Sequence, residues 1–266
     1  MLFRSAGEIL DNHPFSGGGA YVNNGSMEMS GGSITYNSLQ SGAAGFGGGV
    51  YLESGMALSL SGSPKINGNY MSDGRTPQNV YYKVSGPKSS VGTGGIKLSL
   101  SSAISSSADI GVYCATTPTG IDESVDGAVV DITGSDSKDV VAALDDYSFI
   151  KPDQDGCEVI KSNKDLESRL RLRYGHTVTF YIDTSAGDQG ILADYDSTVN
   201  AKDAYSATAD VVHNNTLSSI PNVTGTASGH NFEGWYVVDS KSEITSTKVT
   251  KTTLITDSIK LKAKIT

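Results

Sequence analysis

Carboxylates are the first side chains in this sequence that could do chemistry, because two of them a few ångströms apart can hydrolyse a glycosidic bond. In the clearest part of the chain, residues 17–72, the acids are Glu28 and Glu53, and they occupy different positions of a repeat. Lyase chemistry needs clustered acids for calcium and a basic proton acceptor, but the corresponding strand positions hold Tyr, Asn and Ser. The sequence therefore predicts no catalytic residue and a protein that is not an enzyme. A carbohydrate-active enzyme, either a polysaccharide lyase or a hydrolase, is the alternative.

Metal-binding patterns are missing as well. The four histidines lie far apart, without the spacing of zinc ligands, at His13, His176, His213 and His230. The segment Asp-Gln-Asp-Gly at 153–156 resembles half of a calcium loop but lacks the later ligand positions, so we interpret it as a turn. We predict neither a metal nor a cofactor.

A column of aromatic residues is the best candidate for ligand binding. Tyrosines recur at intervals of about thirty residues, at Tyr21, Tyr51, Tyr81 and Tyr113. Alternation along a short strand puts Val50 and Leu52 on one face and Tyr51 on the other, so we expect the phenol rings to form an outward stripe. Exposed rings can stack on sugars or peptide side chains. Alternatively the rings stack on one another and shield the aliphatic residues beneath, which is the interpretation we favour.

The sequence has one tryptophan and two cysteines, which are too few for a disulfide framework. The sole tryptophan, Trp235, lies beside Phe232, and we expect it in the core of a small domain. Cys114 falls on an inward position, and Cys157 falls on the strand one repeat later. A disulfide between them is geometrically allowed, but two buried free thiols are the favoured interpretation.

The elements that must position these residues belong to an internal repeat. The segment GGGAYVNNGSMEMSGGSITYN at 17–37 recurs as GGGVYLESGMALSLSGSPKINGN at 47–69, and SAGEILDN at 5–12 is a half-copy. A period of about thirty residues fits one coil of three short strands joined by turns, with successive coils about 4.8 Å apart. We therefore predict an all-β chain with a right-handed parallel β-helix over 1–173.

Stacked coils would place like residues on like. We expect two inward aliphatic columns, which are Ala20, Val50, Val80 and Val112, and Val22, Leu52, Tyr82 and Cys114. We expect a third column, of amides at a bend. Each amide stands three residues after an isoleucine, at Asn12, Asn37 and Asn69. A short amphipathic helix is predicted over 137–149, with Ser137 as its N-cap, followed by two closing strands within 157–174.

A second domain is predicted over 174–266, because the columns stop there and a new alternating strand, HTVTFYID, begins. The whole chain has 266 residues and a net charge of −9, and residues 101–150 alone hold nine acids against one lysine. A solvated flank is the simple interpretation of this acidic stretch, and a weak cation site is the other. With no basic stripe, nucleic acid and anionic membrane surfaces are poor partners.

Two resemblances rest on these motifs. The segments GGGAYVNNGSMEMSGGSITYN and GGGVYLESG resemble the repeats of bacterial surface adhesins with pectate-lyase-like or polymorphic outer membrane protein-like β-helices. The strands at 177–180, 232–236 (FEGWY) and 258–265 are similar to the internalin B-repeat (Listeria–Bacteroides repeat) domain, which implies a small β-rich, β-grasp-like fold. The sequence departs from the internalin B-repeat pattern in two places: no NGG follows the first strand, and the chain ends in Lys-Ile-Thr.

Both resemblances imply a secreted, modular protein on the bacterial cell surface. The expected role is display, adhesion or stiff spacing, with a glycan or a host or microbial surface protein as partner. No apolar run is long enough to span a bilayer, and the first residues have no apolar core of a signal peptide. Because the sequence starts inside a repeat, we expect a fragment of a longer parent, without its signal peptide and its anchor.

Overall fold

The computed structural model describes residues 2–3, 7–42, 45–83, 95–98, 103–121, 129–133, 137–162, 168–186 and 190–266. Contacts divide the chain into two compact units, Met1–Tyr174 and Gly175–Thr266, so the division falls one residue from the predicted boundary. The chain is all-β, as predicted. Four acids of the predicted acidic stretch lie outside the described residues, namely Asp122, Glu123, Asp126 and Asp136.

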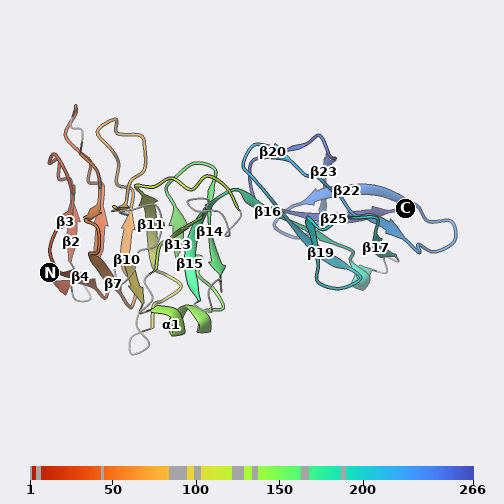
Figure 1. The fold of residues 1–266 in the computed structure, drawn as a ribbon, viewed down its shortest axis with the longest axis horizontal. Coiled ribbons are helices and arrows are strands. Elements are labelled where there is room, and N and C mark those ends of the chain that lie inside the picture. Colours follow the sequence, from red (N-terminus) through yellow and green to blue (C-terminus); the bar gives the residue numbers. More distant parts are fainter. Residues whose placement is uncertain are drawn as a thin grey trace. The chain divides into compact units, whose positions relative to one another are not determined.

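The first unit is built from short strands that recur once per repeat. The described strands of the repeats are β1 (Leu2–Phe3), β2 (Glu8–Leu10), β3 (Ala20–Val22), β4 (Ser26–Met29), β5 (Ser33–Thr35), β6 (Val50–Leu52), β7 (Ala57–Leu60), β8 (Lys65–Asn67), β9 (Val80–Tyr82), β10 (Gly95–Leu98), β11 (Asp109–Cys114) and β13 (Ile150–Pro152). Each pairs in parallel with its counterpart one repeat away, which gives one sheet in the order β1-β4-β7-β10 and another in the order β2-β5-β8-β11-β9-β6-β3, with β13 on β11. Figure 1 shows these strands side by side in the order of the repeats.

The predicted aliphatic columns are confirmed by the register of these sheets. Ala20 pairs with Val50, Val50 with Val80, and Val80 with Val112. Val50, Leu52 and Val80 have no exposed surface, because alternate positions along each strand face the interior. Burying one such side chain contributes about 1.5–3 kcal/mol, and the columns form part of the core of the unit.

The predicted amide column is also present, and it is longer than predicted. Each asparagine donates its backbone N–H and its side-chain Nδ2 to the Oδ1 atom of the next, from Asn12 to Asn37 at 3.1 and 2.9 Å and from Asn37 to Asn69 at 3.0 and 3.0 Å. Asn69 does the same to Asn79 at 2.8 and 3.0 Å, and Asn79 donates to the carboxylate of Asp153. We call this run, from Asn12 to Asp153, the amide ladder.

The predicted helix is shorter than expected and is not capped as expected. Helix α1 spans Lys138–Ala143, and Leu144 is already extended. Ser137 stands at the N-cap position, as predicted, but its side chain makes no cap hydrogen bond. Instead Ser137 is buried and its Oγ accepts the backbone N–H of Leu98 at 2.9 Å. At the other end, Lys161 Nζ donates to the carbonyls of Ala142 and Leu144 at 2.8 and 2.7 Å, which satisfies carbonyls that a helix end leaves open.

The closing strands lie where they were predicted, but they run antiparallel. Strand β14 (Cys157–Ser162) pairs along its whole length with β15 (Arg169–Tyr174), and β15 also pairs with β12 (Val129–Asp131). Leu170 and Leu172 of β15 are fully buried in the core of the first unit. This small sheet therefore continues that core.

The second unit contains a six-stranded sheet in the order β18-β19-β16-β25-β22-β23. Its strands are β16 (His176–Tyr181), β18 (Val199–Ala201), β19 (Ser206–Val211), β22 (Phe232–Val238), β23 (Ile244–Val249) and β25 (Ile259–Ile265). Two small sheets accompany it, made of β17 (Ile191–Ala193) with β21 (Asn222–Thr224) and of β20 (Asn215–Thr216) with β24 (Leu254–Ile255). Strands β16 and β25 pair in parallel at its centre, and all other pairs are antiparallel.

The prediction that Trp235 packs in the core of this unit is confirmed. Its side chain is 1% exposed and contacts the rings of Phe180 and Phe232, with centroids 5.1 and 5.5 Å away. Its Nε1 donates to the carbonyl oxygen of Pro221 at 2.6 Å, so the one polar atom of the ring is satisfied without solvent.

Candidate functional site

The four tyrosines of the predicted column lie in register on neighbouring strands. Tyr21 of β3 pairs with Tyr51 of β6, which pairs with Tyr81 of β9, which pairs with Tyr113 of β11. The ring centroids are 4.9, 5.2 and 5.8 Å apart in that order. The last two pairs are stacked, whereas Tyr21 meets Tyr51 edge-on at 82°. We call this set the tyrosine ladder.

The expectation that all four rings are exposed is wrong for the two in the middle. Tyr51 is 7% exposed and Tyr81 is 6% exposed, whereas Tyr21 is 49% exposed. Each central ring lies between two neighbours of the ladder, and the ring of Phe46 stacks on Tyr81 at a centroid distance of 4.6 Å. Mutual stacking therefore covers most of the ladder, as the favoured interpretation predicted.

A carboxylate lies at the hydroxyl edge of the exposed end of the ladder. Oε1 of Glu53 accepts the hydroxyl of Tyr21 at 3.0 Å and that of Tyr51 at 3.2 Å, while Oε2 lies 3.1 Å from Lys83 Nζ. Burial tends to raise the pKa of Glu53, but hydrogen bonds from Lys83 and Tyr21 outweigh it and hold the pKa below its usual value. Glu53 is thus an anionic acceptor shared by two phenols.

Burial also sets the protonation of the central rings. It raises the pKa of Tyr51 to about 12, with the nearby charge of Glu53 adding to the effect. Burial likewise raises the pKa of Tyr81 to about 12. Both phenols are therefore neutral hydrogen-bond donors at physiological pH. The sequence indicated the rings but not Glu53, although Glu53 stands two residues after Tyr51, on the same face of the strand.

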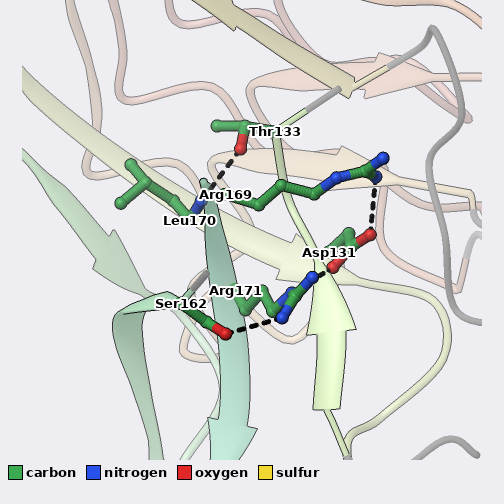
Figure 2. A network of polar contacts seen from close by, with 6 residues as sticks. All are labelled: Asp131, Thr133, Ser162, Arg169, Leu170 and Arg171. Atoms are coloured by element: carbon green, nitrogen blue, oxygen red, sulfur yellow. Dashed lines mark hydrogen bonds and ion pairs between the residues drawn. The ribbon is translucent and has the colours of Figure 1, made fainter. Parts of the chain in front are cut away.

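A second polar cluster joins the closing strands. In Figure 2 the guanidinium groups of Arg169 and Arg171 point at one carboxylate, that of Asp131, at 2.7 and 2.6 Å. Arg171 also donates to Ser162 Oγ at 2.6 Å, and Thr133 Oγ1 accepts the backbone N–H of Leu170 at 2.9 Å. These contacts tie β12, β14 and β15 together, so we assign the cluster a structural role. The alternation of Arg with Leu in RLRLRY was the signal for it in the sequence.

Two histidines that look unrelated in the sequence meet in the second unit. His176 Nε2 and His213 Nδ1 share a hydrogen bond of 2.7 Å, and His176 is 5% exposed. Antiparallel pairing of β16 with β19 brings them together, because His176 pairs with Val211. Within the described ranges, no three side chains of His, Cys, Asp or Glu lie close enough to hold a metal ion.

The cysteines are both buried and free, in agreement with the favoured interpretation. Burial raises the pKa of Cys114 to about 12 and that of Cys157 to about 12, so neither thiol offers a reactive thiolate. Of the acidic stretch, Asp109 is paired with Lys151 at 2.7 Å, and Asp131 binds the two arginines. These two acids serve as structural partners and not as a solvated flank.

Comparisons with known proteins leave the tyrosine ladder to be interpreted from its own geometry. None of the described helices has the length and apolar character needed to cross a membrane. No protein-family model, no curated protein and no solved structure matches this chain.

Proposed function

We propose that the chain is a non-enzymatic segment of a secreted bacterial cell-surface protein, which acts as a display or adhesion module or as a stiff spacer. The observation that carries this proposal is the run of unbroken columns in the first unit. Ile9, Ile34 and Ile66 pair in register, and so do the residues of the tyrosine ladder. A stack in which every repeat is tied to the next by core, amides and rings resists bending, which suits a spacer.

The finer fold belongs to the same proposal. We infer that the parallel strands of the first unit wind as a right-handed β-helix of the kind found in surface adhesins. Three strands per repeat and a spacing of about thirty residues support this inference. For the second unit we infer a β-grasp-like, internalin B-repeat-like fold. Its first long strand, β16, and its last, β25, lie side by side and parallel at the centre of the sheet, which supports that inference.

A rigid spacer has a measurable property, namely a fixed distance between its ends. Spin labels on Asn24→Cys and Asp155→Cys, both at exposed positions, would report that distance by pulsed electron spin resonance. The buried Cys114 and Cys157 should not take up label in the native protein. We expect one narrow distance distribution, and a broad one once Asn37→Ala interrupts the amide ladder. A broad distribution in the otherwise unchanged protein would contradict the spacer role.

Catalysis and adhesion need separate assays. Incubation with soluble polysaccharides should release neither reducing ends nor unsaturated sugars, and release of either would establish the enzyme alternative. An adhesive role predicts retention on a glycan array or on a surface protein, weakened by Tyr21→Ser at the exposed end of the tyrosine ladder. A narrow distance distribution without any retention would leave the spacer role and remove the adhesive one.

A further inference from the structure

The exposed end of the tyrosine ladder has a geometry that packing alone does not require. The rings of Tyr21 and Tyr51 meet edge to face, with centroids 4.9 Å apart. Their hydroxyl groups converge on a single oxygen, Oε1 of Glu53, at 3.0 and 3.2 Å. Two neighbouring phenols therefore share one anionic proton acceptor.

We propose that Tyr21 and Tyr51 are a site of oxidative modification, at which hydrogen peroxide and a peroxidase join the two rings by a dityrosine bond. Phenol oxidation is easiest when the O–H proton can leave to a nearby base as the electron leaves. Glu53 is such a base, and its side chain is 25% exposed, so it can pass each proton to water.

The reaction balances without any other reagent. Tyr21 gives one electron to the peroxidase directly, and Tyr51 gives one through the ring of Tyr21 that it contacts. Each phenol gives its hydroxyl proton to Glu53, which leaves two tyrosyl radicals. The radicals couple between ring carbons next to the oxygens, and each ring then loses the hydrogen on that carbon as a proton while its phenol is restored. The two electrons and two protons lost overall reduce one hydrogen peroxide to two waters.

Exposure favours this pair over the other pairs of the ladder. Tyr21 is 49% exposed, so a diffusing oxidant can reach it first. The pairs Tyr51–Tyr81 and Tyr81–Tyr113 are stacked at 24° and 21°, so they present faces to each other and not an edge. The cross-link should therefore form at one end of the ladder and not along it.

Such a bond would join β3 to β6. In the order β9-β6-β3 these are neighbouring strands from successive repeats. The described cysteines are free, so a tyrosine bond would supply a covalent tie between repeats that no disulfide provides there. Oxidised protein should accordingly unfold at a higher temperature than untreated protein.

A dilute solution of the 266-residue protein, treated with hydrogen peroxide and peroxidase, would test the proposal. Tyr36 is exposed and shares a glutamyl-protease fragment with Tyr51, so the experiment uses a Tyr36→Phe background. We expect blue dityrosine fluorescence in the monomer, a mass lower by two hydrogens, and a covalent link between fragments 9–28 and 29–53. In that background Tyr21 and Tyr51 are the tyrosines of these two fragments.

Matched variants separate the proposed reaction from general damage. Tyr21→Phe and Tyr51→Phe keep the rings but remove a hydroxyl, and each should abolish the linked fragments. Glu53→Gln keeps the size of the side chain but not its basicity, and should lower the fluorescence yield several-fold while circular dichroism stays unchanged. Cross-links only between molecules, or an equal yield in Tyr51→Phe, would overturn the proposal and leave the spacer role untouched.

Discussion

The carboxylate of Asp153 accepts both the backbone N–H and the side-chain amide of Asn79, at 2.6 and 2.8 Å. Gly111 lies against this contact, since a Cβ there would fall 2.2 Å from Asp153 Oδ1. Asp153 therefore ends the amide ladder in a confined position. Burial raises the pKa of its carboxyl group to about 6, and the hydrogen bonds from Asn79 only partly oppose this effect.

The raised pKa of Asp153 predicts that the protein loses stability as pH rises. The ordinary value is 3.8, so the folded state holds the proton more tightly than the unfolded state, and the stabilisation is complete below about pH 4 and lost through about pH 6. This difference between the pKa values of the folded and unfolded states corresponds to about 3 kcal/mol of stability. Urea unfolding at about pH 4.5 and about pH 7.5 should show this loss in the natural protein but not in Asp153→Asn. Equal pH dependence in both proteins would show that the group is not buried as described.

Interrupting the amide ladder should cost more than removing an exposed amide. Asn37 accepts two hydrogen bonds from Asn12, and its own Nδ2 lies 2.9 Å from the carbonyl oxygen of Ile9. Asn37→Ala removes these contacts and also the hydrogen bond that the buried Asn37 side chain donates to Oδ1 of the buried Asn69, so we expect a loss of about 3 kcal/mol in the free energy of unfolding. The control Asn24→Ala, in an exposed turn, should change it by less than about 0.5 kcal/mol. Similar losses from both variants, measured by urea titration, would contradict the structural role of the ladder.

The tyrosine ladder should stabilise the protein unequally along its length. Tyr81 is buried between Tyr51, Tyr113 and Phe46, so Tyr81→Ser should cost about 3 kcal/mol. Tyr21 is half-exposed and touches one ring of the ladder, so Tyr21→Ser should cost about 1 kcal/mol. Thermal unfolding of the two variants side by side would measure this difference, and the reverse order would argue against the burial described.

The cysteines offer a chemical probe of unfolding. Cys114 and Cys157 are buried and their thiols keep their protons, with pKa values of about 12. Neither should react with a thiol-specific disulfide reagent in the native protein at about pH 8, and both should react at once in concentrated urea. Fast reaction of one thiol without denaturant would indicate local opening of the strand that carries it.

Much of the first unit follows from the spacing of its residues. Strand alternation separates Val50 and Leu52 from Tyr51, and equal intervals bring like residues into register. The last members of the amide ladder could not be predicted in this way. Asn79 follows Asn69 after only ten residues, and Asp153 comes 74 residues later, so neither matches the interval of the repeat.

Other features depend on contacts that spacing does not encode. Phe46 covers Tyr81 from a turn with no counterpart aromatic in the other repeats. Ser137 has a capping residue's chemistry, but the nearby N–H of Leu98 competes for its oxygen. His176 and His213 meet only because β16 and β19 pair antiparallel, and that pairing is a property of the folded chain.

The amide ladder has a direction. Each asparagine of the ladder donates one hydrogen bond from Nδ2 to the member nearer Asp153, and the carboxylate of Asp153 only accepts. A copy of residues 38–69 could therefore be inserted after Asn69 with every ladder amide still hydrogen-bonded, since each asparagine would again have an asparagine Oδ1 as its acceptor. A copy inserted after Asp153 would meet its carboxylate, which has no hydrogen to donate to the next acceptor. Evolution or an engineer could thus lengthen this protein by whole repeats on one side of that residue only.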